Sequence, residues 1–191
     1  MKIIGLNGSP REESNVRFLL SKALDKAEGM EAETELIEVR KIMDKQEDPF
    51  CIHCSSPCDK RCYEGTELDT VYDKLMDADG IILASPVYFG SVSAQLKALW
   101  DKSRAVRTEY GLVGTVGAAI SVGASAYGGQ ETTMTTLHNM MLVHGMTIVA
   151  NGIKGIKAGH YGAAGKDQVF QNEHAIEDAE IVGKRVVETI K

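Results

Sequence analysis

The sequence lacks the long apolar runs and the surplus of positive charge that mark several common protein classes. None of its apolar stretches approaches the ~18 residues of a membrane-spanning helix. The first residues, Met1–Gly5, lead directly into a core-like strand and lack the apolar run and cleavage site of a secretory signal. The formal net charge of −6 provides no basic footprint for nucleic acid. We therefore expect a cytoplasmic protein that spans no membrane and binds no nucleic acid.

Cysteine is also scarce, and its placement is uneven. The 191 residues include four cysteines, all within one short window: Cys51, Cys54, Cys58 and Cys62. In a reducing compartment such a cluster indicates a metal or redox site more than a disulfide framework. The spacing C-x2-C-x3-C-x3-C would let one loop wrap a compact iron–sulfur cluster. A structural zinc, which more often uses two separated Cys-x2-Cys pairs, and local disulfides remain alternatives.

Apolar residues recur along the chain in an alternating pattern of strands and helices. Short apolar runs predict strands at 2–6, 34–39, 80–84, 116–122 and 146–150. Helical spacing predicts helices at 14–28, 68–76, 92–99, 131–144 and 175–190. This alternation predicts a doubly wound α/β fold with a five-stranded parallel sheet, in the flavodoxin-like order 2-1-3-4-5.

The same pattern sets our expectation for domain organisation. We expect a single domain over residues 1–191, with the cysteine-rich loop at about residues 48–65, after the second strand. The glycine-rich segment 151–165 is interpreted as a flexible connection. Ligands bind such sheets outside the carboxyl ends of the strands, at the switch point, so the loops after the first, third and fourth strands are the candidate sites.

The loop after the first strand, NGSPREESN (7–15), combines short polar side chains with a fixed cation. Ser9, Ser14 and Asn15 can form hydrogen bonds, Arg11 carries the charge, and the next helix starts with free backbone N–H groups. These features suit a phosphate. A polar turn in which Ser14 or Asn15 caps the helix is the alternative. The absence of G-x-G-x-x-G after the first strand argues against a dinucleotide Rossmann site.

The loops after the third and fourth strands have the features of a site for a flat ring. In the first of them Tyr88 and Phe89 are adjacent aromatics, and Gly90 allows a close backbone approach. Exposed amides beside an aromatic suit a flat heteroaromatic ring, and packing of both aromatics under the loop is the alternative. After the fourth strand, Ser121 offers a hydroxyl and Gly123 frees the backbone, so this loop either closes over the same ring or simply starts a helix.

These loops resemble those of a known family. GSPREESN, SPVYFGSVSAQLKALWDK and VGASAYGGQE are similar to the three cofactor loops of the NAD(P)H-dependent FMN reductase group of flavodoxin-fold proteins, over nearly the whole chain. The resemblance implies FMN, with its phosphate at the first loop and its ring between the other two. The implied cofactor-binding residues are Ser9, Arg11, Ser14, Asn15, Pro86, Val87, Tyr88, Phe89, Gly90, Ser91, Ser121 and Gly123. Where the family often has Gly-Asn-Thr this chain has Ser14-Asn15-Val16, so Val16 cannot supply a hydroxyl.

Within that group, the added cysteine loop resembles that of the archaeal and anaerobic-bacterial iron–sulfur flavoproteins. Those proteins pair FMN with a [4Fe–4S] cluster and commonly form dimers or tetramers, with cluster and flavin near subunit interfaces. The resemblance implies that Cys51, Cys54, Cys58 and Cys62 hold the cluster. The usual pattern has C-x2-C-x2-C followed by a longer gap, whereas here one residue moves from the last gap into the middle one.

The functional hypothesis is therefore an electron carrier. A one-electron donor such as ferredoxin would reduce the cluster, and FMN would deliver the electrons to an acceptor. This function requires no side-chain acid or base, and we assign no catalytic residue. One alternative is an NAD(P)H-dependent reductase of quinones, nitro compounds or free flavin. Another is a zinc-stapled flavodoxin-like module without redox turnover.

Overall fold

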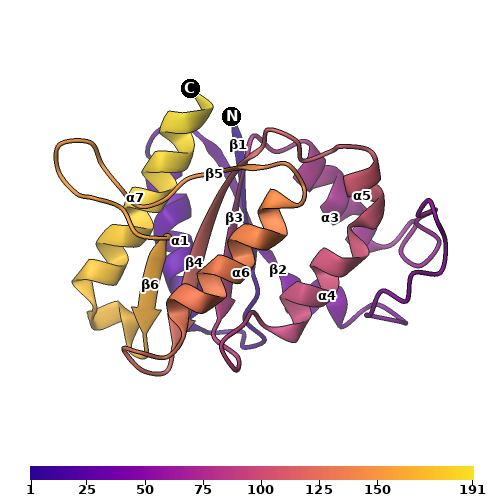
Figure 1. Cartoon of the computed structure of the whole chain (residues 1–191), viewed down its shortest axis with the longest axis horizontal. Helices are drawn as coiled ribbons and strands as arrows, with labels where there is room; N and C mark the ends of the chain where they lie inside the picture. The colour runs from indigo at the N-terminus through magenta and orange to yellow at the C-terminus, as the bar shows by residue number, and fades with distance from the viewer.

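The computed structural model describes residues 1–191 and is built around one parallel sheet (Figure 1). The sheet has the order β2-β1-β3-β4-β5, and β6 also pairs with β4. Its strands are β1 (Lys2–Asn7), β2 (Glu33–Glu38), β3 (Gly80–Pro86), β4 (Val116–Gly123), β5 (Thr147–Ile148) and β6 (Ala163–Lys166). Every pairing is parallel. The flavodoxin-like order expected from the sequence is confirmed, with the cysteine-rich loop after β2.

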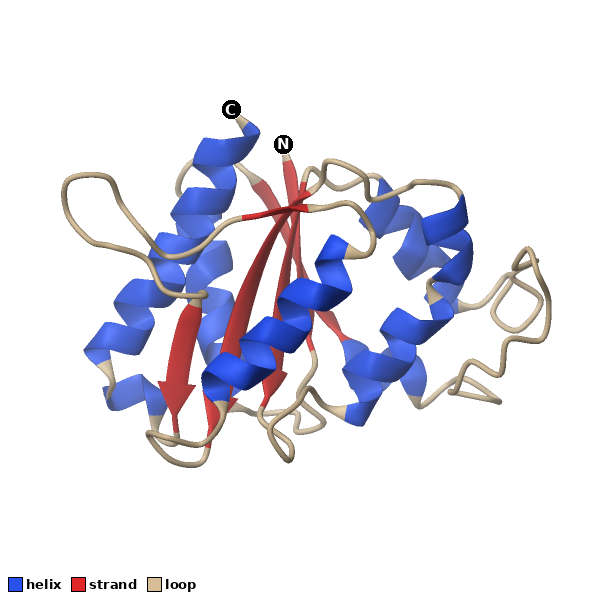
Figure 2. Cartoon of the chain, in the orientation of Figure 1, coloured by secondary structure: helices blue, strands red, loops and turns tan.

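Helices cover both faces of the sheet (Figure 2). They are α1 (Asn15–Glu28), α2 (Val39–Met43), α3 (Glu67–Met76), α4 (Ala94–Lys102), α5 (Arg104–Thr108), α6 (Gln130–Leu142) and α7 (Glu173–Ile190), with a short 3₁₀ helix, η1 (Val169–Gln171). One hydrophobic core joins α1 and α7 to the sheet, and a second joins α2, α3, α4 and α6. None of the helices has both the length and the apolar character needed to cross a membrane.

The two cores explain why the central strands are almost wholly apolar. Successive residues of a strand point to opposite faces. In β3, Ile81 belongs to the core under α3 and α4, and Ile82 to the core under α1 and α7. Both residues are fully buried. A strand covered on both faces therefore has no polar side, and its continuous apolar run identifies it in the sequence.

The fifth position of the sheet differs from the prediction, because two short strands share it. β5 pairs with Val116 and Gly117 at the start of β4, and β6 pairs with the end of β4 from Ile120 to Gly123. Between them the chain leaves the sheet as a loop, at the left of Figure 1. The buried Asn151 Oδ1 accepts a hydrogen bond from the His160 backbone N–H at 2.7 Å and closes this loop at its base. The expectation of a flexible connection over 151–165 is thus wrong for residues 163–165, which belong to β6.

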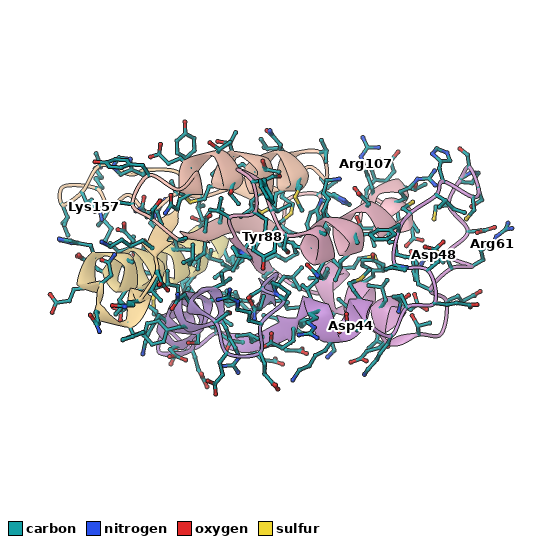
Figure 3. The ribbon with its side chains drawn as sticks, turned by 90° about the horizontal axis from the view of Figure 1, so that it is seen from below. Asp44, Asp48, Arg61, Tyr88, Arg107 and Lys157 are labelled. Carbon is teal, nitrogen blue, oxygen red and sulfur yellow. The ribbon has the colours of Figure 1, made fainter.

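The cysteine-rich loop lies between α2 and α3 and projects beside α4 and α5 (Figure 1). Figure 3 views the molecule from the carboxyl ends of the strands, with Tyr88 near the middle of that edge. Asp48 and Arg61, both in the cysteine-rich segment, lie toward one end of the molecule. Within one chain, therefore, the cysteine loop is set apart from the centre of the carboxyl edge.

Candidate functional site

A cleft of about 650 Å³ opens at the carboxyl ends of β1, β3 and β4. It contains eight of the twelve predicted cofactor-binding residues: Ser9, Arg11, Ser14, Asn15, Pro86, Val87, Tyr88 and Gly123. The phosphate-type loop, the aromatic loop and the end of β4 thus meet around one space, at the switch point where a flavodoxin-like sheet binds its ligand. The other four predicted residues, Phe89, Gly90, Ser91 and Ser121, do not line this cleft.

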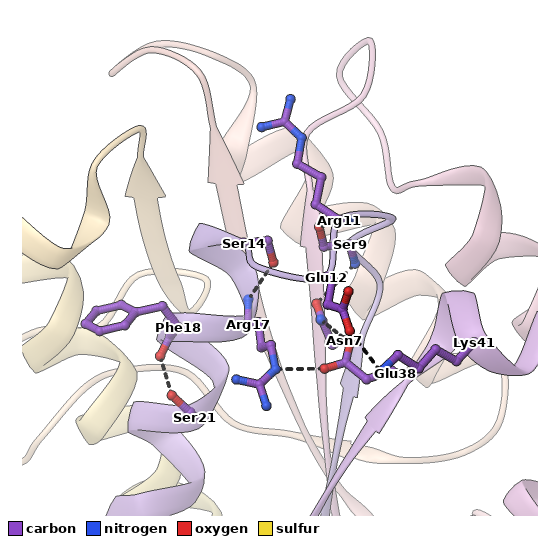
Figure 4. A network of polar contacts seen from close by, with 10 residues as sticks. All are labelled: Asn7, Ser9, Arg11, Glu12, Ser14, Arg17, Phe18, Ser21, Glu38 and Lys41. Atoms are coloured by element: carbon purple, nitrogen blue, oxygen red, sulfur yellow. Dashed lines mark hydrogen bonds and ion pairs between the residues drawn. The ribbon is translucent and has the colours of Figure 1, made fainter.

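The first loop is shaped by a network centred on the buried Asn7 (Figure 4). Asn7 Oδ1 accepts a hydrogen bond from the Ser9 N–H at 3.1 Å, and Asn7 Nδ2 donates to Glu38 Oε2 at 2.6 Å. The other oxygen of Glu38 accepts from Arg17 Nε at 2.8 Å. Gly8 lies so close to β3 that an added Cβ would come within 2.8 Å of the Ala84 carbonyl oxygen. The loop is therefore held in one shape before any ligand binds.

Two serines of this loop accept backbone hydrogen bonds and keep a donor free. Ser9 Oγ accepts from the Arg11 N–H at 3.2 Å, and Ser14 Oγ accepts from the Arg17 N–H at 3.1 Å as the N-cap of α1. The capping role weighed for Ser14 is thus correct. It does not compete with phosphate binding, because each hydroxyl hydrogen can still be donated.

The cation of the loop points away from its network. Figure 4 shows the Arg11 guanidinium directed away from the Glu38 network, and Arg11 lines the cleft. Asn15 Nδ2 donates to Asp167 Oδ1 at 3.0 Å, which ties the start of α1 to the segment after β6. Arg11 and the two serine hydroxyls are therefore the groups of this loop that fit a phosphate.

The aromatic loop is a tight turn anchored on both sides. Tyr88 and Ser91 exchange two backbone hydrogen bonds, at 2.9 and 3.1 Å, and the Val87 N–H donates to the Val122 carbonyl at 2.8 Å. Phe89, at the tip, has a φ of 50° and is fully exposed. Because Tyr88 is also 42% exposed, the alternative that both aromatics pack under the loop is wrong. Tyr88 faces the cleft and Phe89 faces solvent.

The loop after β4 is organised by Gln130, a residue that no local sequence motif indicates. Its Nε2 donates to the carbonyls of Ser125 at 2.6 Å and Gly165 at 3.1 Å, and its Oε1 accepts from the Gly128 N–H at 2.9 Å. A Cβ added at Gly123 would lie 2.6 Å from Gln130 Nε2. Gly123 is therefore required so that this amide can pass close to the backbone.

The sequence pattern also did not predict two other residues of the cleft. Asp167 and Phe170 line the cleft from the segment after β6. Their place at the carboxyl edge follows from β6, a strand that the periodicity did not reveal. Ser121 is fully buried in β4 and its Oγ has no hydrogen-bond partner.

The cysteine loop carries four possible metal ligands, but they are not arranged as a preformed metal site. All four thiols are free; Cys51 and Cys58 are half-buried, and Cys54 and Cys62 are exposed. The structure gathers no group of three or more His, Cys, Asp or Glu side chains in position to hold a metal ion. Four free, accessible thiols in one loop fit an iron–sulfur cluster by the chemistry of the donor set. Their role as ligands stays a prediction.

Side chains outside the loop attach it to α5. Arg104 donates to the Ser55 carbonyl at 3.1 Å and contacts His53 Nε2 at 3.1 Å. Since a guanidinium can only donate, His53 Nε2 is the acceptor. Lys60 pairs with Glu109 at 3.0 Å, and this contact raises the pKa of Lys60.

A local ion pair sits within the loop itself. The hydrogen bonds from Arg61 hold the pKa of the exposed Asp59 carboxyl at about 2. Asp59 also accepts a hydrogen bond from Ser55 Oγ at 3.1 Å, so the turn between Cys54 and Cys62 carries its own polar contacts.

A parallel sheet of this order with a ligand cleft at its switch point defines a flavodoxin-like α/β protein. Residues 1–160 match the family described as NADPH-dependent FMN reductase. The chain is 41% identical over 196 residues to an iron–sulfur flavoprotein of Methanocaldococcus jannaschii, covering 100% of this chain and 98% of that protein. It is 40% identical over 153 residues to an iron–sulfur flavoprotein of Methanosarcina thermophila, covering 79% and 78%. The chain belongs to the iron–sulfur flavoproteins of the NADPH-dependent FMN reductase family, and the resemblance stated from its motifs is confirmed.

Solved structures bear out the fold. An NADH:FMN oxidoreductase in its apo form aligns with a TM-score of 0.74 at 17% identity, covering 100% of this chain and 90% of that chain. A WrbA-like flavodoxin from Agrobacterium tumefaciens aligns with a TM-score of 0.63 at 20% identity, covering 99% and 95%. At these identities the likeness concerns the arrangement of the chain alone.

Proposed function

We propose that the chain is an electron-transfer flavoprotein, a single domain over residues 1–191 that binds FMN in the cleft and a [4Fe–4S] cluster at the cysteine loop. One observation carries the proposal. A chain of this family presents four free thiols in one loop, while its carboxyl-edge cleft combines a free cation, two donor hydroxyls and an aromatic turn. The proposed ligands are Cys51, Cys54, Cys58 and Cys62.

The residues of the cleft have a binding and positioning role in this proposal. Arg11, Ser9 and Ser14 would hold the phosphate, with the loop kept in shape by the Asn7–Glu38 contact. Pro86, Val87 and Tyr88 would bound the ring on one side and Gly123 on the other, with Gln130 fixing the second wall. We assign no acid or base, since electron transfer needs none.

The bound cofactors would supply the redox chemistry: FMN exchanges electrons singly or in pairs, and an iron–sulfur cluster exchanges them singly. The proposed electron donor is a ferredoxin-like protein. NAD(P)H is the second candidate, because the matched family is described as NADPH-dependent. Free thiols in a chain of this kind fit a reducing compartment, and we propose the cytoplasm.

We further propose that the protein works as a homo-oligomer, a dimer or a tetramer. The cysteine loop and the cleft of one chain lie apart (Figure 3), so a neighbouring chain is needed to bring a loop close to a cleft. Two fully exposed aromatics, Phe89 and Tyr127, stand on the adjacent loops around Gly90 and Gly129. Exposed aromatics of this kind are enriched where subunits meet.

Reduction under anaerobic conditions tests the function. Reduced ferredoxin should bleach the visible absorbance of the wild-type protein, and a variant with all four cysteines changed to serine should keep its flavin but accept these electrons poorly. NAD(P)H should act slowly on both proteins. Fast NAD(P)H oxidation that the four serine substitutions leave unchanged would favour the conventional reductase instead.

A further inference from the structure

One buried hydroxyl beside the cysteine loop has no hydrogen-bond partner. Tyr63 directly follows Cys62 and is 1% exposed, yet its Oη contacts no acceptor or donor. Buried polar atoms without a partner are rare in folded proteins because they cost free energy. A group bound at the cysteine loop would give this hydroxyl the partner that it lacks.

The Tyr63 side chain is fixed in place. Its backbone N–H donates to the Lys60 carbonyl at 2.9 Å, and its carbonyl accepts from Thr66 Oγ1 at 2.6 Å. Its ring packs edge to face on Tyr72, with ring centroids 4.9 Å apart. The turn and the stacked ring therefore hold the hydroxyl inside the protein, where it cannot rotate out to water.

The Tyr63 hydroxyl can donate a hydrogen bond, and the neighbouring cysteine loop offers acceptors for it. A tyrosine hydroxyl carries one proton that it can donate. The four thiols of the loop form no disulfide, and Tyr63 directly follows one of them, Cys62.

We propose that Tyr63 Oη donates a hydrogen bond to a cysteine sulfur of the bound iron–sulfur cluster and raises the reduction potential of that cluster. The inference rests on the proposed function, which makes the four cysteines of the loop ligands of the cluster. A hydrogen bond to a ligand sulfur stabilises the more negatively charged, reduced state more than the oxidised state. Tyr63 is thus a positioning and tuning residue for the cluster and does not itself exchange electrons.

The stacked partner provides a matched control. Tyr72 Oη donates to the Leu99 carbonyl at 2.6 Å, so its hydroxyl already has an acceptor away from the loop. Tyr63→Phe and Tyr72→Phe each remove one hydroxyl from the same aromatic pair and keep both rings. Tyr63→Phe should therefore affect the reduction potential of the cluster, and Tyr72→Phe should affect the stability of the fold.

A redox titration of the anaerobically purified holoprotein, followed by cluster EPR, tests the inference. Tyr63→Phe should shift the cluster potential to more negative values and leave the unfolding midpoint of the apoprotein unchanged or higher, since an unpaired polar atom is removed. Tyr72→Phe should leave the potential unchanged and lower the unfolding midpoint. Equal potentials for wild type and Tyr63→Phe, or an equal shift for both variants, would overturn the inference.

A second measurement uses only the wild-type protein, so it tests the inference even if Tyr63→Phe folds poorly. Pulsed EPR of the wild-type cluster should detect a strongly coupled proton that exchanges in D2O and is not a backbone amide, and its absence would overturn the inference. Failure of the proposed function looks different. Wild-type protein without iron and sulfide would remove the function and the inference together, whereas an intact cluster with an unchanged Tyr63→Phe potential removes the inference alone.

Discussion

The Arg104 guanidinium donates a hydrogen bond to the Ser55 carbonyl at 3.1 Å, across 49 residues of sequence. A second nitrogen of the same side chain reaches His53 at 3.1 Å, and Glu109, directly after α5, pairs with Lys60. α5 thus contacts the cysteine loop from both of its ends. This five-residue helix therefore helps to fix the position of the loop.

Replacing Arg104 with lysine should loosen the cysteine loop. A lysine offers a point charge and cannot reproduce the planar fork that contacts His53 and Ser55 together. Hydrogen exchange read by mass spectrometry should show faster exchange over residues 51–58. Arg107→Lys is the matched control, because Arg107 on the same helix donates to the carbonyl of Val143, directly after α6. Similar exchange in the two variants would contradict the anchoring role of Arg104.

Arg11→Gln should weaken FMN binding without weakening riboflavin binding. Riboflavin lacks the phosphate, so it serves as the control ligand on the same variant. Loss of one charge-assisted hydrogen bond, about 1.5–3 kcal/mol, corresponds to a roughly 10- to 150-fold weaker affinity. Fluorescence titration of the apoprotein with both ligands at one salt concentration measures this. Equal weakening for the two ligands would show that Arg11 supports the ring site or the fold instead.

Gly123→Ala should lower both flavin affinity and stability. The new Cβ would lie 2.6 Å from Gln130 Nε2 and displace the amide that holds the loop after β4. In a Gln130→Ala background the clash disappears, so the same glycine substitution should cost much less there. A double-mutant cycle on unfolding free energy and flavin affinity gives the coupling between the two residues. Additive effects would contradict the close approach.

Stability should fall on acidification below about pH 6.5 because of His144. This side chain is 6% exposed and its Nε2 contacts Ser103 Oγ at 3.0 Å. Burial, and then the charge of Arg107, lowers the pKa of His144 from 6.5 to about 4. Between these values the unfolded chain binds a proton that the folded chain does not, so the folded state loses stability as the pH falls.

Urea unfolding at pH 7.5 and pH 5 measures this effect. His144→Gln should lower stability at the higher pH and reduce the loss between the two. Part of the loss should remain, because burial also lowers the pKa of His138. An unchanged pH dependence in the variant would contradict the account.

The sequence predicted the parts of the fold whose physical cause is local. β1, β3 and β4 are buried on both faces, so their apolar runs identify them, and the loops that follow them could be placed at one edge. The sequence did not predict β6. Its four residues, Ala163–Lys166, alternate in burial and contain glycine, so they form no apolar run typical of a buried strand. The sequence did not predict α5 either, because five residues are too few to show helical periodicity.

The candidate site could likewise be predicted only where its residues follow strands that the sequence identifies. The phosphate-type loop and Tyr88 follow strands that the sequence revealed, and the structure brings them to one cleft. Asp167 and Phe170 depend on β6, and Gln130 acts through hydrogen bonds between segments far apart in the chain, which no local pattern encodes. The orphaned hydroxyl of Tyr63 likewise became visible only from its burial.

Iron, acid-labile sulfide, zinc and FMN content per chain, measured on anaerobically purified protein, tests the central claim most directly. The account predicts about four irons, about four sulfides and about one FMN, as expected for a [4Fe–4S] flavoprotein. It also predicts that serine at Cys51, Cys54, Cys58 and Cys62 removes the iron and sulfide but not the FMN. Zinc without sulfide, or FMN in a wild-type chain that holds no iron, would contradict it.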